Sequence, residues 1–239
     1  MAKGYRPSKD KSEVRNVNPQ NAGDETIIDL GKVKAETESY FHKNQTMILS
    51  VLGGLVLLVG AFFAYKYLYK EPKQNEALEQ MYQAELMFQK DSLDAALNNP
   101  GGGHAGFKEI AENYAGTPAG NLAKYYAGLC NLYLGNYKDA KDYFTGFNAE
   151  GEVMTILKNG GLGDASADLN ELDAAVAFYE KASNSDNEFL TPTYLKKLAV
   201  LKEKMGDKAA AIAAYTKIKE KYPNAPDANN IERFIIANQ

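Results

Sequence analysis

The chain of 239 residues has little of the chemistry that enzymes, metal sites and disulfide scaffolds require. Its one cysteine, Cys130, excludes an intrachain disulfide, so the fold must depend on burial alone. Its two histidines, His42 and His104, are too few and too far apart in sequence for a histidine-built metal site. The formal net charge is -4, which gives no sign of the basic surface that binds nucleic acid.

One long uncharged segment, from Asn44 to Tyr65, determines the class of protein. About 20 helical residues span the ~30 Å hydrocarbon core of a bilayer, and lipid requires every backbone group to be paired internally. The segment is apolar all round, which argues against a buried core helix with a polar stripe. We therefore predict one transmembrane helix over 46–69. Aromatic residues suited to the membrane interface flank it on both sides: Tyr40, Phe41, Tyr65, Tyr67 and Tyr69.

A cleaved signal peptide is the alternative interpretation of this segment. More than 40 polar residues precede the apolar run, and the following "AFFAYKY" is a poor cleavage site, so an uncleaved anchor is favoured. Two pairs of small residues, Ser50 with Gly54 and Gly60 with Ala64, suit close approach of another transmembrane helix. They fit equally well with the general abundance of glycine in membrane helices.

The region before the anchor has two parts. Residues 1–26 are polar and are predicted to be a disordered tail. Residues 27–45 have apolar side chains at three- and four-residue steps, which predicts a juxtamembrane amphipathic helix. Lysines balance across the anchor, but the short tail adds basic residues that count toward orientation. We expect the N-terminus in the cytoplasm and the C-terminal domain on the other side. The tail's basic residues are Lys3, Arg6, Lys9, Lys11 and Arg15.

After the anchor, only helices and short turns are expected, so the predicted class is all-α. Pro72 predicts a break or kink, and a first helix over 75–98 ends at the breaker "NNPGGG". From Phe107 to the end, no stretch alternates apolar and polar residues for long enough to predict a strand.

Three segments of the C-terminal part repeat one another: "GNYKDAKDYFTGF", "NELDAAVAFYEKA" and "GDKAAAIAAYTKI". In each copy a turn residue precedes an alanine by five positions and an aromatic residue by nine. Another small residue lies 12 positions before the alanine, and equivalent alanines are 35 and 36 residues apart. The predicted packing residues are Gly128, Gly135, Ala140 and Phe144; Gly163, Asn170, Ala175 and Tyr179; and Ala199, Gly206, Ala211 and Tyr215.

This spacing predicts stacked helical hairpins. The two small residues of a unit allow its helices to cross closely, and the aromatic residue fills the space toward the next hairpin. One hairpin cannot bury its own apolar faces, so neighbours must stack. The alanine-rich run at 209–214 is therefore expected to pack helix on helix rather than to bind a ligand.

These residues resemble the tetratricopeptide repeat, whose period is about 34 residues. "LGNYKDAKDYF" matches well, and Pro223 supplies the closing proline of the last unit. Asn131 and Asn170 depart from the pattern, and "KNGGLGDAS" predicts a weak, bendable helix. A half-match of 107–118 to 215–226 indicates an earlier unit, which gives about four hairpins within a domain over 75–239.

No constellation of residues predicts catalysis, and no cofactor is expected. Gly101, Gly102 and Gly103 lack the strand and the Gly-Lys-Ser/Thr sequence of a phosphate-binding loop, so a flexible connection is favoured. Cys130 lies beside apolar residues on a predicted helix and fits an inert, buried position. We therefore predict a protein that is not an enzyme.

The expected binding surface is the face of the stack built from the first helix of each hairpin. An apolar, tyrosine-bearing groove suits a helix or an extended segment of a partner protein. Val200 stands where a clamp for C-terminal carboxylates requires asparagine, which disfavours that ligand. The candidate groove residues are Tyr125, Leu129, Leu132, Tyr133, Lys196 and Val200.

The order of tail, single anchor and repeat domain resembles the YfgM-type ancillary subunit of the bacterial Sec translocon. "GDASADLNELDAAVAFYEKA" and "AGNLAKYYAGLCNLYLGNYKDA" are the sharper matches, and "GTPAGNLAKYYAG" resembles Bacteroidetes-type homologues. The resemblance implies an inner-membrane protein with a periplasmic domain that works beside the translocon and periplasmic chaperones on exported clients. A structural scaffold of a cell-envelope complex, and a regulator that signals through its tail, remain the alternatives.

Overall fold

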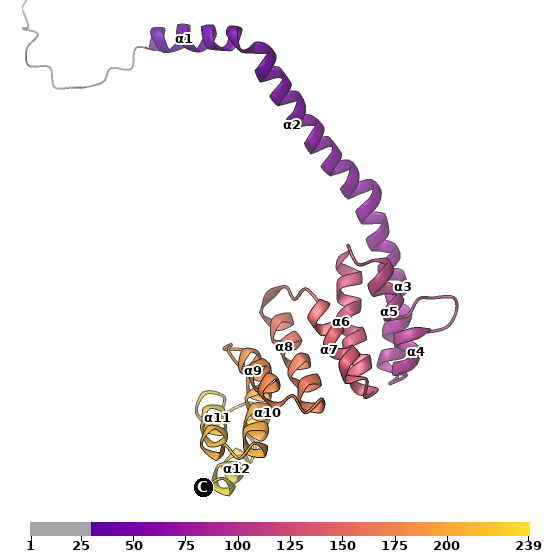
Figure 1. The fold of residues 1–239 in the computed structure, drawn as a ribbon, viewed down its shortest axis with the longest axis vertical. Coiled ribbons are helices and arrows are strands. Elements are labelled where there is room, and N and C mark those ends of the chain that lie inside the picture. The colour runs from indigo at the N-terminus through magenta and orange to yellow at the C-terminus, as the bar shows by residue number, and fades with distance from the viewer. Residues whose placement is uncertain (1–29) are drawn as a thin grey trace, which may run out of the picture. The chain divides into compact units, whose positions relative to one another are not determined.

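The computed structural model describes residues 30–239, and every regular element in that range is a helix (Figure 1). The predicted all-α class is confirmed. The expected tail over 1–26 and the first residues of the expected helix over 27–45 lie outside the described residues. The chain divides into two compact units, Met1–Gly60 and Ala61–Gln239, and each is considered separately.

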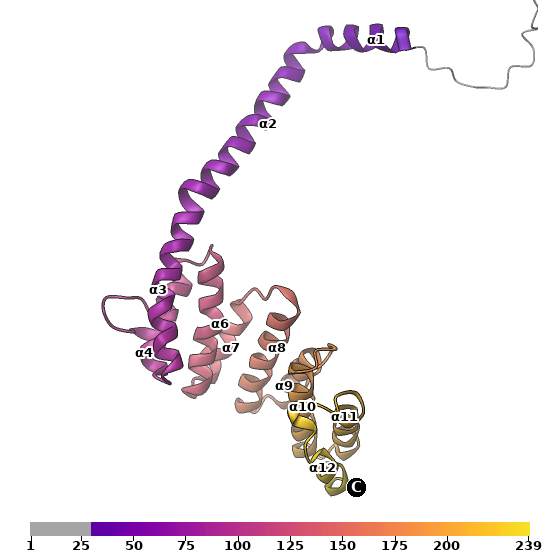
Figure 2. The ribbon, with the colours of Figure 1, turned by 180° about the vertical axis from the view of Figure 1, so that it is seen from behind.

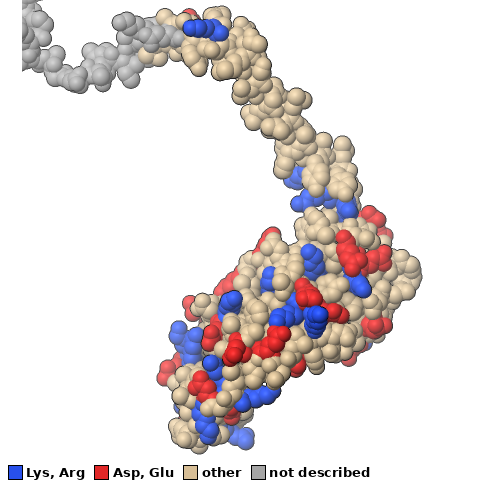
Figure 3. Space-filling model, in the orientation of Figure 1, with Lys and Arg blue, Asp and Glu red and all other residues tan. Residues whose placement is uncertain are grey.

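The first unit contributes α1 (Leu30–Lys43) and most of α2 (Gln45–Tyr65). No residue of α2 is buried, although its sequence is almost wholly apolar. Figure 3 shows α2 free of charged side chains along its length. Among the described residues none packs around α2, unlike the surroundings of a core helix in a soluble domain. Within the described residues, one helix is long and apolar enough to cross a membrane, which is consistent with a single transmembrane helix.

Of the break or kink expected at Pro72, the break was wrong, because the chain stays helical through this residue. A π-helical segment, Lys66–Lys70, precedes α3 (Glu71–Gln89) instead. The backbone N–H of Glu71 donates to the carbonyl of Lys66, five residues earlier. A wider π-helical turn moves the preceding carbonyls away from the proline ring, which would clash with them in a regular α-helix.

The second unit continues as a series of helices that pack on their neighbours in sequence (Figure 2). The first helices of the hairpins are α3, α6, α8 and α10, and each of the last three packs on the first helix before it. The remaining bounds are α4 (Leu93–Asn98), α5 (Phe107–Asn113), α6 (Pro118–Tyr133), α7 (Tyr137–Gly146), α8 (Gly151–Asp168), α9 (Leu172–Ala182), α10 (Leu190–Lys204), α11 (Lys208–Lys221), a 3₁₀ turn (Pro226–Ala228) and α12 (Ile231–Ala237).

Four first helices end in the same left-handed turn. The residues with positive φ are Asp91 at 57°, Gly135 at 83°, Asn170 at 58° and Gly206 at 84°. In each turn the N–H of the positive-φ residue donates to the carbonyl of the residue three positions earlier. The N–H of the following residue donates to a carbonyl five positions before that following residue. This is the Schellman closure, which pairs the last carbonyls of a helix and reverses the chain. Residues 71–221 therefore contain four hairpins with equivalent turns.

The four residues with positive φ allow the four hairpins to be aligned with one another. Seven positions before each lies a small residue, and five positions after each lies an alanine with no exposed surface. The small residues of the first helices are Ala84, Gly128, Gly163 and Ala199, and the alanines of the second helices are Ala96, Ala140, Ala175 and Ala211.

The first hairpin corrects the predicted helix over 75–98. Its first helix ends at Gln89, and α4 is already the start of the second helix. Residues 99–106 form a loop that divides this second helix into α4 and α5. The loop closes on itself, because a β-carbon on Gly106 would lie 2.4 Å from the carbonyl oxygen of Leu97. An inserted segment therefore explains why Ala84 and Gly128 are 44 residues apart.

The glycine-rich middle of α8 lies inside a continuous helix of 18 residues. Gly160, Gly161 and Gly163 are all buried, and an aromatic ring lies against each of them. Burial of these rings offsets the low helix propensity of glycine.

Candidate functional site

Aromatic rings on the second helices pack against the first helix of the same hairpin, and Phe144 also packs against the first helix of the next hairpin. Phe144, on α7, lies so close to Gly128 and Gly161 that a β-carbon there would be 2.7 Å and 2.6 Å from its ring atoms. Gly163 faces the ring of Tyr179 in the same manner. The ring on a second helix therefore occupies space that the missing side chains leave open.

The last unit follows the same plan with alanine in place of glycine. Ala199 and Ala211 have no exposed surface, and Tyr215 is fully buried beside them. The hydroxyl of Tyr215 donates to Glu203 at 3.0 Å, and its ring lies 5.4 Å from the ring of Phe234 on α12. These packing residues position the exposed faces of the stack and have no free surface of their own.

The equivalent positions of the first helices define one surface, called here the first-helix face. One residue after each small residue lie Glu85, Leu129, Asp164 and Val200. Three residues before it lie Tyr125 and Lys196 on α6 and α10, whereas the equivalent Met81 and Gly160 are buried. Five residues after it lie Gln89, Tyr133, Asp168 and Lys204. The face is therefore apolar mainly on α6, acidic on α8 and basic on α10.

The structure separates the groove residues expected on α6. Tyr133 is 64% exposed, whereas Tyr125 and Leu129 are partly buried against the core. Leu132 is buried among Ala140, Phe144, Leu162 and Ala165, so its predicted place in the groove is corrected: it belongs to the core.

The two groove residues expected on α10 lie toward the C-terminal end of the stack. The ammonium of Lys196 donates to Asp227 in the 3₁₀ turn at 3.2 Å, and Thr193 donates to the other carboxylate oxygen at 2.6 Å. Val200 is 49% exposed. Lys196 is therefore already engaged, while Val200 is available to a partner.

Asp164 organises the centre of the first-helix face. Its carboxylate accepts a hydrogen bond from the hydroxyl of Tyr179 at 2.7 Å and two from the ammonium of Lys197, both at 2.7 Å. Tyr179 lies on α9 and Lys197 on α10, so one carboxylate connects three helices and two hairpins. Sequence reasoning did not identify the two partners, Tyr179 and Lys197. An acid one residue after a small residue, with a lysine 33 positions later, was the available signal.

The tyrosines near Asp164 are shielded from water and face negative charge. Burial, with Tyr133, Tyr126 and Asp164 nearby, raises the pKa of Tyr125 to about 12. Burial and then Asp164 raise the pKa of Tyr179 and of Tyr194 above the ordinary value. These hydroxyls therefore stay protonated at neutral pH and act as hydrogen-bond donors rather than as bases.

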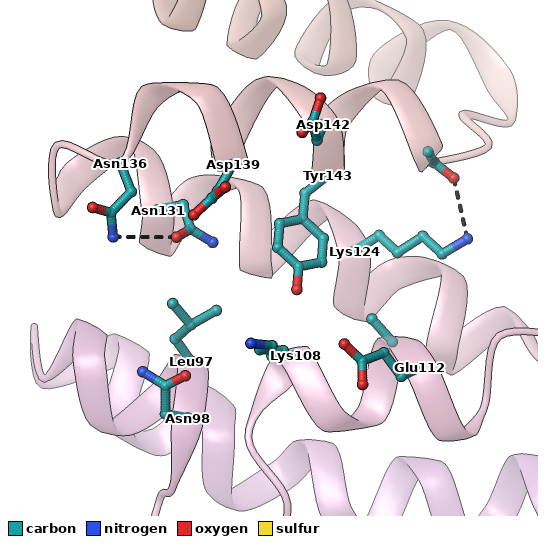
Figure 4. Close-up of a pocket in the computed structure, with 12 residues that line it drawn as sticks. Leu97, Asn98, Lys108, Glu112, Lys124, Asn131, Asn136, Asp139, Asp142 and Tyr143 are labelled. Carbon is teal, nitrogen blue, oxygen red and sulfur yellow. Dashed lines mark hydrogen bonds between the residues drawn. The ribbon is translucent and has the colours of Figure 1, made fainter.

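A cavity of about 550 Å³ lies on the opposite side of the stack, between the second helices α5 and α7 (Figure 4). Lys108 and Glu112 line it from α5, and Tyr143 projects into it from α7. Lys124 donates to the carbonyl of Gly146 at 3.2 Å across one end. Opposed charges and a tyrosine make this a polar recess, and none of the six predicted groove residues lines it.

The described residues contain no group of three or more His, Cys, Asp or Glu side chains placed to hold a metal ion. Cys130 has no exposed surface, and burial raises the pKa of its thiol to about 12, so the reactive thiolate is disfavoured. Gly101, Gly102 and Gly103 lie in the inserted loop, all with positive φ, and join α4 to α5.

Comparison with protein families found the tetratricopeptide repeat at residues 197–225, which cover the end of α10, the turn at Gly206 and α11. No curated protein and no solved structure matched the chain. The predicted repeat is confirmed for the last hairpin. The shared turns and packing residues extend its geometry to the three hairpins before it. Tetratricopeptide repeats indicate a role in protein–protein interaction, typically without catalysis. The resemblance to a translocon subunit has no support from these comparisons.

Proposed function

We propose that this protein is a membrane-anchored adaptor whose first-helix face holds polypeptide partners near the bilayer. The observation that carries the proposal is the exposure of Tyr133 and Val200 on the face that the stack builds from its first helices. Large apolar side chains in such positions suit contact with a partner protein. The wholly exposed, uncharged α2 supports attachment through a single span.

The setting that we propose is the bacterial inner membrane, with the tail in the cytoplasm and the repeat domain in the periplasm. The order of tail, span and repeats supports a place beside the Sec translocon and periplasmic chaperones, where exported chains emerge. Mixed charge on the first-helix face fits transient contact with varied chains, because such a surface has no single deep apolar pocket.

Protein contact is tested with a photoreactive aromatic amino acid at Tyr133 in native membranes. Adducts with translocon subunits, chaperones or exported chains are expected. Lys138, which is exposed on α7, is the matched control position and should give none of them. Adducts with one fixed envelope protein alone would favour a scaffold, and identical adducts at both positions would contradict a specific face.

Topology is tested with protease added to intact and to osmotically opened cells. The repeat domain should be digested once the outer membrane is opened, while an epitope on the tail stays protected. Protection of the repeat domain by the inner membrane would overturn the proposed orientation and the role in export together.

A further inference from the structure

A second groove lies between the second helices α9 and α11, away from the first-helix face. Its volume is about 670 Å³, and α10 forms its floor. Leu195 and Leu198 on that floor are buried, at 3% and 9% exposure. Ala177 on α9 and Ala213 on α11 are exposed along the two walls.

The groove is open because its walls carry alanines. In the α5–α7 cavity, long side chains such as Tyr143 and Glu112 project into the space between the second helices. Only two of the alanines in the run at 209–214, Ala211 and Ala214, are buried, so the expectation that the whole run packs helix on helix was too broad. Ala213 instead leaves space that a larger side chain from elsewhere can fill.

The charge around the groove is mainly positive. Lys181, Lys202 and Lys217 line it, against one acidic residue, Glu180. Lys202 reaches Asp207 at 3.7 Å, whereas Lys181 and Lys217 form no ion pair among the described residues. The Lys181 ammonium lies 5.5 Å from the centroid of the Phe178 ring, a contact that uses no hydrogen-bond donor. Two ammonium groups, one on each wall, can therefore still pair with carboxylates.

The shape of the groove favours a helix as its occupant. Both walls are α-helices whose backbone groups are already paired, so an extended segment would leave its own N–H and C=O groups without partners against alanine. A helix pairs these groups internally. The 11 residues of α9 give a wall of about 16 Å, which matches roughly three turns of helix.

We propose that this groove binds an acidic amphipathic helix of a partner protein. Leucine-sized side chains of that helix fill the space above Leu195 and Leu198, and its carboxylates pair with Lys181 and Lys217. Phosphate groups of a lipid or a nucleic acid fit less well, because the alanine and leucine surface would face them. The site is distinct from the first-helix face and does not depend on the function proposed for that face.

The probe is a fluorescent peptide of about 12 residues, with leucines at helical three- and four-residue spacing and glutamates elsewhere. It is titrated against the full chain in zwitterionic nanodiscs. Saturable binding is expected, with weaker affinity as salt rises. An all-polar peptide of equal charge should bind at least about tenfold more weakly, a difference of about 1.4 kcal/mol. Equal binding of the two peptides would show simple charge attraction and overturn the proposal.

Variants locate the site. Lys181→Glu with Lys217→Glu should weaken the peptide at least about tenfold, and Ala213→Leu should do the same by filling the groove. Lys208→Glu, on the exposed start of α11 outside the groove, is the matched control and should leave affinity within about twofold. Circular dichroism verifies that each variant is folded.

Two further outcomes would contradict the proposal. If Ala213→Leu and the double lysine variant both bind like the parent chain, the peptide lies elsewhere. If a photoreactive residue at Asn184, which is exposed at the edge of the groove, links two copies of the chain instead of the peptide, the groove serves self-association. Tyr133→Glu on the first-helix face, where the side chain is 64% exposed, should not alter peptide binding, so failure here is separable from failure of the proposed adaptor role.

Discussion

The ring of Tyr194 lies directly on the backbone of Gly160, although the two residues belong to different hairpins. A β-carbon on Gly160 would fall 2.1 Å from Cζ of the ring and 2.2 Å from its hydroxyl oxygen. Both residues are buried, Tyr194 at 8% exposure. A glycine inside a helix costs about 0.5–1 kcal/mol relative to alanine. Here that cost accompanies a close contact which joins α8 to α10.

Gly160→Ala should therefore destabilise the protein although alanine is the better helix former. Displacing a buried ring costs about 1–3 kcal/mol, which exceeds the gain in helix propensity. Urea unfolding of the full chain in detergent micelles, followed by circular dichroism, measures the change. Gly146→Ala is the control, since its β-carbon would meet only Lys124, at 3.9 Å. Equal stability of the two variants would show that the contact with Tyr194 is unimportant.

Sequence reasoning predicted the features that are set by contact between backbones. Gly128 and Gly163 were recognised because small residues recur at a fixed spacing, and in the structure an aromatic ring lies against each of them. The turn residues Gly135, Asn170 and Gly206 were found by the same spacing, and the structure adds that each has the positive φ that few residues adopt. Positions that local steric constraints determine can therefore be identified from the sequence.

Features that depend on long-range packing were missed. The turn at Asp91 was read as helix, because aspartate is not a strong turn signal by itself and the inserted loop moved Phe107 out of register. Leu132 and Tyr133 are adjacent and both apolar, so periodicity alone could not decide which one faces the core. The α9–α11 groove was missed because an exposed alanine and a packed alanine look alike in sequence.

Asp164→Ala should lower stability through the two groups that it leaves without an acceptor, Lys197 and the hydroxyl of Tyr179. We expect a loss of about 1–2 kcal/mol, reduced from the value for a fully buried charged hydrogen bond because Lys197 is partly exposed. Asp164→Asn should lose less, since its amide oxygen still accepts from Tyr179. A double-mutant cycle with Tyr179→Phe measures the coupling.

The control for that cycle is the more exposed pair of Lys219 and Glu232, which joins α11 to α12. Glu232→Gln should change stability by no more than about 0.5 kcal/mol, because exposed ion pairs contribute little. A loss as large as that of Asp164→Ala would mean that the Asp164 cluster has no special role.

Stability should fall as pH rises above 10, the ordinary tyrosine pKa. Burial raises the pKa of Tyr179, Tyr194 and Tyr215 in the folded state, so below that pH both states hold the proton and stability is complete. Above it the unfolded chain releases protons first, and each tyrosine lowers the free energy of unfolding by about 1.4 kcal/mol per pH unit until its folded pKa is reached.

Urea unfolding of the full chain at about pH 8 and about pH 11 tests this dependence. Tyr194→Phe should make the fall of the unfolding free energy with pH shallower by the contribution of one tyrosine. Because the variant keeps every lysine, the difference excludes lysine titration as its cause. Stability that rises with pH, or a slope unchanged in the variant, would contradict the assignment.

Asn170 is the turn residue at which the third hairpin departs from glycine, and its φ of 58° carries a cost. Asn170→Gly should stabilise the protein by up to about 1 kcal/mol, because glycine adopts this conformation freely. Asn170→Ala should destabilise it by about 1 kcal/mol, since alanine lacks a short polar side chain that eases positive φ. The two closing bonds, from Asn170 to Ala167 and from Glu171 to Ser166, involve only the backbone and stay available in both variants. Thermal unfolding of the full chain ranks the variants, with Gly206→Ala as the reference for an unrelieved left-handed turn. If Asn170→Ala is as stable as Asn170→Gly, the left-handed conformation of residue 170 does not limit the stability of this hairpin. The four turns would then share their geometry but differ in energy.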